Sequence, residues 1–304
     1  MMRHVIIAGG TGFIGSALVH VLKTEGFSVT VLTRKQKKNP QEMSWTEVNV
    51  KGLPKTATDI INVAGQNVLD LRSRWTPKFR EAVWQSRVNT NRILAEAIPN
   101  SNVKCFISIS GVAYYPPSDT REYTEYDKCE KYDFFSDLVH NWEAASELPS
   151  TSNCRKVIIR SGVVLGRKGG IIQQTYWPFF FGLGGPLGDG SQYMPWIHID
   201  DLAELFLFAL NEEKVDGILN GVSTQMITNK QFATAFAKSL HRPAIIPQPK
   251  FLLDLLFGKE RATIVTGSQK IFPKRPLEYG FKYGYSDIND ACRQFASLMY
   301  TDPY

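Results

Sequence analysis

Short apolar runs alternate with amphipathic stretches at the start of the chain. Val5-Ile6-Ile7-Ala8 is an uninterrupted apolar run, residues 17–22 carry a helical pattern, and residues 29–32 form a second apolar run. Uninterrupted runs of this length are typical of parallel strands that are buried on both faces. The pattern predicts a strand, a helix and a second strand that make one β–α–β unit.

The same alternation continues through the first half of the chain. Further apolar runs predict buried strands at residues 59–65, 105–110 and 157–160. Helical patterns separate them at residues 78–98 and 134–147, and Pro99 ends the first of these helices. This order predicts an α/β fold with a doubly wound parallel sheet of the Rossmann type, whose ligands bind beyond the carboxyl ends of the strands.

The composition changes from Gly166 onward. Aromatic residues and glycines crowd residues 176–188, so we expect no regular helix there and a segment that wraps a binding cavity. The tail from about residue 228 predicts short helices separated by prolines.

These changes predict two structural parts. An NADP-binding Rossmann domain would cover residues 1–165 and be completed by about 196–222. A smaller C-terminal α/β substrate-binding lobe would cover residues 166–195 and 223–304.

A glycine-rich turn joins the first predicted strand to the first predicted helix. It reads Gly9-Gly10-Thr11-Gly12-Phe13-Ile14-Gly15. Gly9 permits the sharp turn, Gly12 lets the backbone approach phosphate groups, and Gly15 lets the helix pack on the strand. The helix N-terminus adds N–H groups and a positive dipole end. The turn predicts a dinucleotide site, and a bare structural turn is the alternative.

The end of the second strand indicates which dinucleotide binds. Thr33-Arg34 stand there, lysines follow at 35, 37 and 38, and no acid occurs before Glu42. An NAD site usually carries an acid at this place, which would repel a 2′-phosphate, whereas an arginine can hold that phosphate with two hydrogen bonds. Arg34 therefore predicts NADP, with a solvated basic loop as the alternative.

Composition excludes several classes of function. The chain has 304 residues, of which 43% are hydrophobic and 21% charged, as in ordinary soluble globular proteins. Part of the modest net charge of +6 lies in the basic cluster at residues 34–38, which a phosphate-bearing small molecule explains. No basic stripe is interleaved with aromatic residues, so we expect no nucleic acid partner.

Cysteine and histidine spacing gives no sign of a metal or a disulfide. The four cysteines form no C-x-x-C pair and predict free thiols in a reducing compartment. The five histidines show no metal-ligand spacing, so we expect no metal.

No apolar run reaches the length of about eighteen residues that a membrane helix needs. Residues 251–257 are the most apolar helical candidate, but they include Asp254. We expect a partly buried helix at a pocket or at a subunit contact, and the latter would make the protein a homodimer. The first strand begins near His4, which leaves no room for a transit peptide, so we expect a cytoplasmic protein without a membrane partner.

These motifs together resemble the extended short-chain dehydrogenase/reductases, which form the NAD-dependent epimerase/dehydratase superfamily. Within it the chain is similar to the atypical epimerase family group, short-chain dehydrogenase/reductase family 39U. The motifs that carry the resemblance are residues 9–15, 33–34, 62–65, 74–75, 86–87, 110–115, 142–143, 160–166, 184–185, 196–201 and 267–269. The resemblance spans essentially the whole chain and implies bound NADP(H) and an unknown small-molecule substrate.

The resemblance also implies cofactor contacts. It places the pyrophosphate at Gly9, Thr11, Gly12, Phe13 and Ile14, the adenosine ribose phosphate at Thr33 and Arg34, and the adenine and ribose at Val63, Ala64 and Gly65. Arg87 would reach toward the cofactor, with a surface arginine as the alternative. Val163 or Val164 would contact the nicotinamide carboxamide through the backbone, with core packing as the alternative.

One departure from the superfamily concerns proton transfer. Its members use a serine or threonine, a tyrosine, and a lysine four residues later that lowers the tyrosine pKa. Ser110 has the expected place, but counting back from Glu143 puts Phe135 at the tyrosine and Val139 at the lysine. No tyrosine of this chain has a lysine four residues later. The usual proton relay is absent.

The sequence therefore predicts an NADP(H)-binding oxidoreductase or epimerase-like protein of unknown substrate. Ser110 and Tyr114 are the candidate catalytic residues, although Tyr114 and Tyr115 could simply pack over the cofactor. The alternative function is a non-catalytic NADPH-binding sensor or scaffold.

Five further polar residues are less specific. His198 could face the cleft or anchor the joint between domains, and His140 should point away from the site. Asp201 is expected to cap a helix that begins at Leu202. Gln66-Asn67 could touch the ribose or substrate, or could only make a turn.

Overall fold

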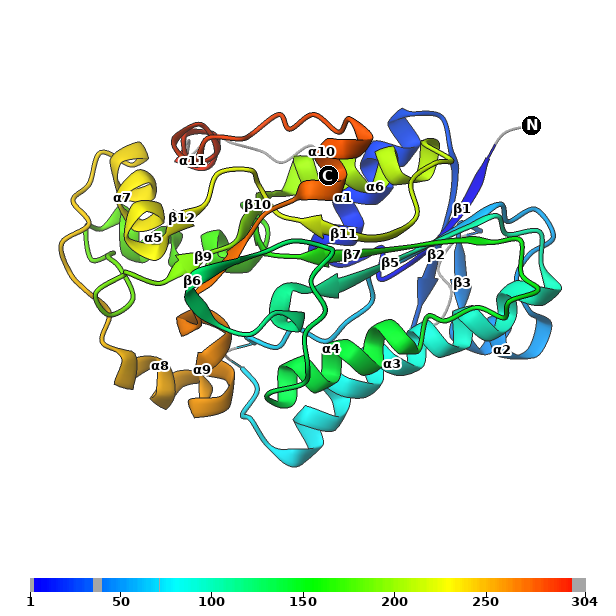
Figure 1. Ribbon diagram of the computed structural model, residues 1–304, viewed down its shortest axis with the longest axis horizontal. Coiled ribbons are helices and arrows are strands. Elements are labelled where there is room, and N and C mark those ends of the chain that lie inside the picture. The colour runs from blue at the N-terminus through cyan, green and yellow to red at the C-terminus, as the bar shows by residue number, and fades with distance from the viewer. Residues whose placement is uncertain (1–2, 35–39, 71, 297–304) are drawn as a thin grey trace.

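The computed structural model describes residues 3–34, 40–70 and 72–296 of the chain. At its centre lies a seven-stranded parallel sheet with the order β11-β7-β5-β4-β1-β2-β3 (Figure 1). The strands are β1 (His4–Ala8), β2 (Ser28–Thr33), β3 (Glu42–Ser44), β4 (Asp59–Asn62), β5 (Cys105–Gly111), β7 (Arg155–Ser161) and β11 (Gly217–Gly221). The chain runs outward from β1 to β3 and then returns to β4 on the other side of β1. The predicted doubly wound sheet is confirmed, and its switch point lies between β1 and β4.

Helices cover both faces of this sheet. One face carries α1 (Phe13–Thr24) and α6 (Ile199–Asn211), and the other carries α2 (Trp45–Lys51), α3 (Pro77–Ala97) and α4 (Phe134–Ala144) (Figure 1). Val5 and Ile7 of β1 pack in the core with α1 and α6, whereas Ile6 and Ala8 pack in the core with α2 and α3. Burial on both faces is the physical reason for the unbroken apolar runs.

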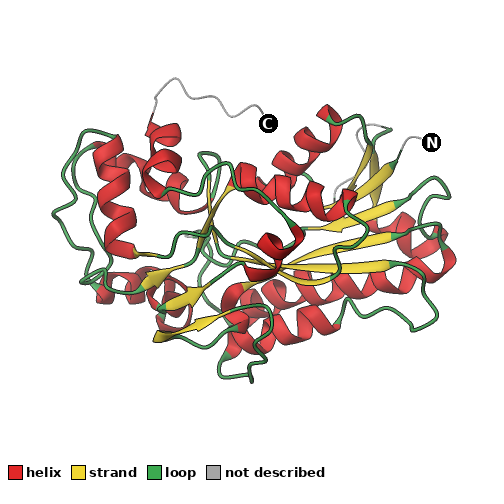
Figure 2. Cartoon of the chain, turned by 45° about the horizontal axis from the view of Figure 1, so that its top comes forward, coloured by secondary structure: helices red, strands yellow, loops and turns green. Residues whose placement is uncertain are grey.

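A smaller part of the molecule lies beside the sheet and is visible at the left of Figures 1 and 2. Its core is formed by α5 (Gly170–Phe180), β9 (Tyr193–Met194), β12 (Ile227–Thr228), α7 (Asn229–Ser239) and α11 (Ile288–Ala296). Strand β8 (Val163–Leu165) pairs with β10 (Trp196–His198), and β6 (Ser118–Tyr123) pairs with β13 (Gln269–Ile271). The C-terminal part also carries α8 (Lys250–Phe257), α9 (Lys259–Thr266) and α10 (Lys274–Tyr279).

The prediction that residues 176–188 contain no regular helix is wrong. Residues up to Phe180 complete α5, and Pro178 lies in its last turn. A proline costs a helix one backbone hydrogen bond, and burial of Phe179 in the smaller core favours the helix in spite of that loss. The glycines that suggested irregular backbone follow the helix.

His198 anchors the joint between the two parts. Its ring is fully buried and stacks between Tyr285 and Phe295, with centroid distances of 3.8 and 4.9 Å. Its Nδ1 accepts a hydrogen bond of 3.1 Å from the backbone N–H of Asp200 and so caps α6. The alternative that His198 faces the cleft is therefore wrong.

Asp201 does not cap α6, contrary to expectation, because the helix begins earlier, at Ile199. Its carboxylate instead accepts hydrogen bonds from the backbone N–H groups of Gly284 and Tyr285, at 2.7 and 3.0 Å. Asp201 therefore ties the C-terminal segment to the start of α6.

Burial of His198 makes a pH dependence of stability testable. Burial lowers the pKa of His198 from 6.5 to about 4, so the unfolded chain takes up the proton first as the pH falls. We expect the stabilisation that comes from burying the neutral imidazole to be complete above pH 6.5. The free energy of unfolding should fall by about 3 kcal/mol as the pH drops from 6.5 to 4. His198→Asn keeps a side-chain acceptor for the cap and should flatten this decline in urea unfolding. An equally steep decline in the variant would contradict the assignment.

Candidate functional site

A cavity of about 410 Å³ opens at the carboxyl ends of β1, β2 and β4, at the switch point of the sheet. Its lining residues are Gly9, Thr11, Gly12, Leu32, Thr33, Arg34, Glu42, Trp45, Val63, Ala64, Gly65, Gln66, Ser86 and Thr90. The structure thus brings together eight of the predicted cofactor residues, namely Gly9, Thr11, Gly12, Thr33, Arg34, Val63, Ala64 and Gly65.

The turn after β1 and the start of α1 leave no room for a side chain at Gly9 or Gly15. Gly9 has a φ of +81°, and a Cβ atom there would lie 2.7 Å from the backbone nitrogen of Ala64. A Cβ atom on Gly15 would lie 2.1 Å from the carbonyl oxygen of Gly9. Helix α1 starts after Gly12 without a side-chain cap. The N–H groups of its first turn therefore suit an anion at the cavity.

The wall of the cavity beside β2 carries both signs of charge. Arg34 follows β2 and is exposed. Glu42 lies on the same wall because β3 pairs with β2, with Val31 opposite Glu42. The expectation that no acid competes at this wall is therefore wrong. The lysines at 35, 37 and 38 lie outside the described residues.

Sequence reasoning missed five lining residues: Leu32, Glu42, Trp45, Ser86 and Thr90. Trp45 begins α2, whose start is fixed by a capping box between Ser44 and Glu47. No periodicity could have revealed β3 and its neighbour, since β3 has only three residues. Ser86 and Thr90 could have been found, because residues four apart share one face of a helix.

Other predicted cofactor residues lie beside the cavity rather than in its wall. A Cβ atom on Gly166 or Gly169 would lie 2.6 or 2.3 Å from the ring of Phe13, so that ring fills the space beneath these two glycines. Ile14 packs against the main core. Phe13 and Ile14 could meet a pyrophosphate only through the backbone of the first turn of α1. Val164 pairs with Ile197 of β10 and also contacts the main core.

Arg87 lies directly behind the cavity wall and is not a surface arginine. Its Nη1 donates to the carbonyl oxygens of Gln66 and Val83, at 3.0 and 3.1 Å. A Cβ atom on Gly65 would lie 3.2 Å from the guanidinium carbon. Burial lowers the pKa of Arg87 to about 10. The guanidinium supports the backbone of Gly65 and Gln66.

Ser110 is held by a buried ion pair. Its hydroxyl donates to Oε1 of Glu143 at 2.8 Å. Nε and Nη2 of Arg160 donate to the two oxygens of the same carboxylate, each at 2.8 Å. A bidentate pair of this kind fixes the carboxylate and, through it, the Ser110 hydroxyl.

Phe135 and Val139, the two positions that the sequence assigned to the tyrosine and lysine of the relay, both carry apolar side chains. Phe135 is buried and its ring lies 5.7 Å from that of Trp75. Val139 is also buried, and its Cγ2 would lie 3.7 Å from a Cβ atom on Gly111, next to Ser110. Neither side chain can donate or accept a proton.

Tyr114 and Tyr115 are engaged in packing around Arg160. The ring of Tyr114 lies 3.3 Å from the Arg160 guanidinium and 4.6 Å from the imidazole of His140. Its hydroxyl accepts a hydrogen bond of 3.3 Å from the backbone of Cys129. The Tyr115 hydroxyl is buried, accepts from Arg160, and has its pKa raised by burial. His140 contacts the carbonyl oxygens of Ser136 and Cys129 and stacks on the ring of Tyr114.

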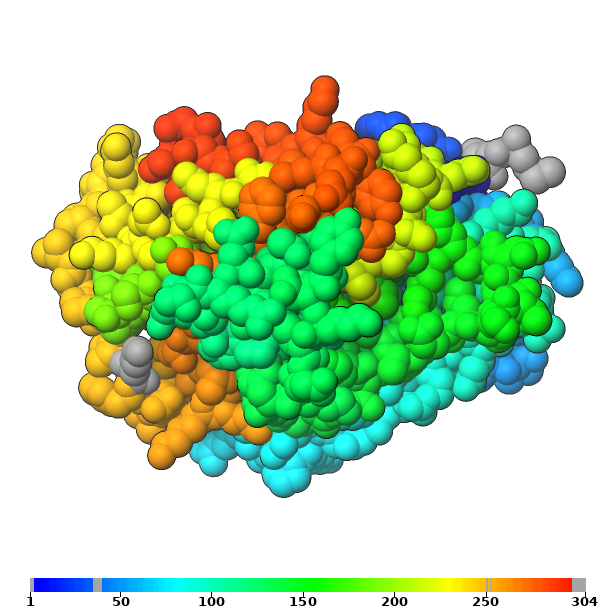
Figure 3. All heavy atoms as spheres, viewed as in Figure 1, coloured from blue at the N-terminus to red at the C-terminus, as the bar shows by residue number. Residues whose placement is uncertain are grey.

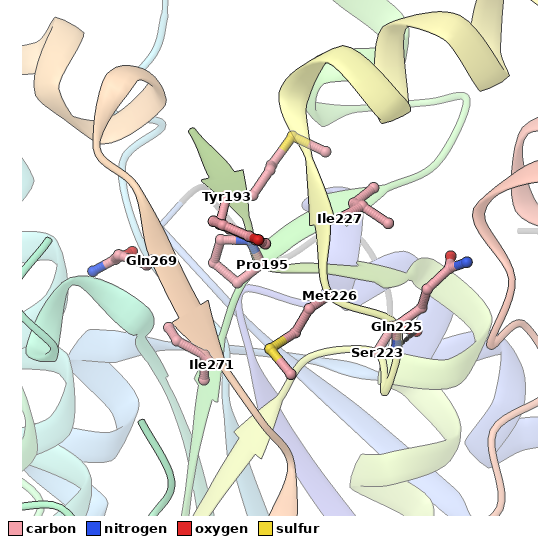
Figure 4. Close-up of a pocket in the computed structure, with 9 residues that line it drawn as sticks. Tyr193, Pro195, Ser223, Gln225, Met226, Ile227, Gln269 and Ile271 are labelled. Carbon is pink, nitrogen blue, oxygen red and sulfur yellow. Dashed lines mark hydrogen bonds between the residues drawn. The ribbon is translucent and has the colours of Figure 1, made fainter. Parts of the chain in front are cut away.

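A second, narrow crevice lies among β9, β12 and β13 (Figure 4). Met226 and Ile271 lie next to each other there, and no space for a water molecule remains. At its rim, Gln269 donates to the carbonyl oxygens of Val112 and Tyr115. The crevice is a packed junction between β13 and the residues that follow β5.

The segments around residues 177–181 and 251–257, which the sequence placed at a cavity or a subunit contact, carry large exposed apolar side chains. Trp177, Phe181, Phe251 and Leu255 are between 55 and 78% exposed. Large apolar side chains of both segments therefore face outward. Phe257, in contrast, is buried in a small local cluster.

Among residues 3–34, 40–70 and 72–296, no group of His, Cys, Asp and Glu side chains is arranged to hold a metal ion. No helix in these ranges has the length and apolar character needed to cross a membrane. All four cysteines are free thiols, as predicted.

Family models match two parts of the chain. Residues 5–220 match the NAD dependent epimerase/dehydratase family, and residues 248–295 match a domain of unknown function, DUF1731. The chain is 43% identical over 293 residues to the epimerase family protein SDR39U1 of Bos taurus, covering 95% of this chain and 98% of the relative.

Solved structures show the same similarity. A crystal structure of human epimerase family protein SDR39U1 with NADPH matches with a TM-score of 0.94 and 42% identity, covering 97% of this chain and 99% of that one. UDP-N-acetylglucosamine 4-epimerase from Bacillus cereus shares only the fold, with a TM-score of 0.77, 16% identity, and coverage of 98% and 100%.

The exposed guanidinium of Arg34 predicts that NADPH binds more tightly than NADH. Arg34→Gln should weaken NADPH binding by about 1.5–3 kcal/mol, because a charged hydrogen bond to the 2′-phosphate is lost, and should leave NADH binding unchanged. Titration calorimetry measures both. Arg92→Gln, which removes an exposed arginine from α3, is the control. Equal affinities of the unmodified protein for NADPH and NADH would refute the role of Arg34.

Proposed function

The chain belongs to the NAD dependent epimerase/dehydratase family, and we propose that it is an NADP(H)-binding oxidoreductase or epimerase-like protein of unidentified substrate that works without a tyrosine–lysine pair. The observation that carries this proposal is the cavity at the switch point, with its glycine turn at one end and Arg34 at the other. A cavity of this size is typical of small-molecule sites. The match to a relative crystallised with NADPH supports the same cofactor here.

The residues of the cavity fit the parts of NADP(H). We assign the pyrophosphate to Gly9, Thr11 and Gly12 with the first-turn backbone of Phe13 and Ile14, the 2′-phosphate to Thr33 and Arg34, and the adenine and ribose to Val63, Ala64 and Gly65. Arg87 would hold the wall behind Gly65, and Val164 would meet the carboxamide through its backbone. When bound, NADPH supplies a hydride.

Proton transfer would need another group than the family tyrosine. Ser110 and Tyr114 are the proposed candidates, because Ser110 lies at the end of β5 beside Gly111, which faces Val139, and Tyr114 follows that strand. The Ser110 hydroxyl already donates to Glu143, so it could give its proton only to that carboxylate unless the network rearranges.

A second function, NADPH binding without turnover, has a specific observation in its favour. Phe135 and Val139 make the relay position wholly apolar, while the cofactor cavity keeps its charged and glycine residues. A protein that senses NADPH or acts as a scaffold needs the cavity and does not need the relay.

We propose that different parts of the chain bind the cofactor and the substrate. Residues 1–165 with about 196–222 would bind the cofactor, and residues 166–195 and 223–304 would bind a small molecule. We place the protein in the cytoplasm, without a nucleic acid partner.

Substitutions at Phe135 and Val139 test the proposed chemistry. The unmodified protein should bind NADPH but oxidise it with simple ketones and aldehydes about 10²–10⁴-fold more slowly than relatives with an intact relay, since a positioned acid contributes about that much. Phe135→Tyr combined with Val139→Lys should raise the rate, followed by NADPH absorbance, without weakening NADPH binding. A buried lysine can destabilise the fold, so thermal unfolding is measured first.

The neighbouring ring provides the matched control. Phe134 is only partly buried and lies one residue from the tyrosine position, so Phe134→Tyr with Val139→Lys should not raise the rate. Ordinary family rates in the unmodified protein would contradict the proposal. Tight NADPH binding with no oxidation over a broad panel would favour the second function.

A further inference from the structure

The loop after β4, residues 66–70, is shaped by donors from three helices. The carbonyl oxygen of Gln66 accepts from Arg87 of α3, that of Leu69 accepts from Gln174 of α5 at 3.3 Å, and those of Val68 and Asp70 accept from Arg261 of α9. Carbonyl groups of an irregular loop need such donors to hold one conformation. Two of these three helices come from the C-terminal half of the chain.

Arg261 is the most deeply buried of these donors, with 2% of its surface exposed. Nη1 donates to the carbonyl oxygens of Val68 and Asp70 at 3.1 and 3.2 Å, and Nε donates to that of Phe257 at 2.6 Å. The described residues place no carboxylate within 4 Å of its guanidinium to form an ion pair. A buried cation is costly to retain unless its donors are satisfied. The carbonyl groups of Val68, Asp70 and Phe257 accept from Arg261, and the negative charge of Asp70 favours its charged form.

Aromatic rings complete the surroundings of Arg261. Its guanidinium lies 5.5 Å from the ring centroid of Trp75, 5.8 Å from that of Phe79 and 5.6 Å from that of Phe257. Faces of aromatic rings stabilise a desolvated cation. Trp75 and Phe79 follow the loop in sequence, so the rings and the carbonyl groups come from the same stretch of chain.

Neighbouring contacts attach the same helix to the same stretch. Glu260 accepts from the indole N–H of Trp75 at 2.5 Å and forms an ion pair of 3.5 Å with Arg80. Leu69 packs against the apolar cluster of Leu253 and Phe257. Figure 1 shows the cyan chain after β4 passing beside α8 and α9, and Figure 3 shows the orange and cyan surfaces in contact at the lower edge.

The other end of this loop belongs to the cofactor cavity. Gln66 lines the cavity, and its backbone N–H donates to Ser86, another lining residue, at 2.9 Å. We infer that Arg261 is a positioning residue that couples the α8–α9 helices to the cofactor cavity through residues 66–70, so that NADP(H) binding orders these helices and their contact strengthens NADP(H) binding. This inference rests on the proposed cofactor. It gives the second family domain, residues 248–295, a role at the cofactor site.

The coupling is tested by NADPH binding and by hydrogen exchange. In the unmodified protein, saturating NADPH should slow amide exchange in residues 250–266. Arg261→Met should weaken NADPH binding by about fivefold or more, within the range of ordinary coupling between sites, and should abolish the slowing in these helices. Arg261→Lys, which keeps the charge but loses the planar fork, should give a partial effect. Because coupling is reciprocal, both readouts must change together.

Arg242→Gln is the matched control. Arg242 also donates to a backbone carbonyl, that of Phe180 at 2.8 Å, and lies 5.6 Å from the ring of Phe180, but it contacts no part of residues 66–70. This variant should leave NADPH affinity and the exchange of residues 250–266 unchanged.

The measurements distinguish failure of the Arg261 coupling from failure of the proposed NADP(H)-binding function. If the unmodified protein does not bind NADPH, the proposed function fails. If it binds NADPH but exchange in residues 250–266 does not respond, or if folded Arg261→Met and Arg261→Lys bind NADPH normally, the coupling is overturned and the proposed function stands. If Arg261→Met does not fold, the lysine variant decides alone.

Discussion

The contact between the β1–α1 turn and the end of β4 is the constraint on which the cofactor site depends. Gly9 approaches Ala64 so closely that no side chain fits between them, and Gly15 is equally close to Gly9. This contact joins the two strands that flank the switch point and aims the start of α1 at the space beyond them. The cavity lies where two strand ends diverge around a turn whose closest contact, at Gly9, leaves no room for a side chain.

Buried arginines support this arrangement from outside. Arg87 and Arg261 donate to backbone carbonyl groups rather than to carboxylates, and each fixes part of the segment after β4. A guanidinium can satisfy several carbonyl groups in different directions, which a lysine cannot do with the same geometry. The loop at the mouth of the cavity therefore depends on side chains that are far away in the sequence.

A buried polar network surrounds Ser110 at the end of β5. Glu143 and Arg160 form a buried pair, Ser110 donates to it, and Tyr115 extends it to Asn220 at 2.9 Å. Breaking a buried pair of this kind is strongly destabilising, because one charge remains without a partner. The hydrogen bond of Ser110 to Glu143 thus has a structural role that is independent of any reaction.

The sequence by itself determined the parallel sheet, its helices and the cofactor turn, because strands buried on both faces and a glycine turn before a helix leave local patterns. It also predicted eight residues of the cavity wall, since they follow strand ends that parallel pairing brings together. Only the tertiary structure decided the rest. Glu42 and Trp45 reach the cavity through a three-residue edge strand, His198 became a helix cap between two rings, and α5 formed despite Pro178. In each case a long-range contact outweighs a weak local preference, and such contacts leave no period or spacing in the sequence.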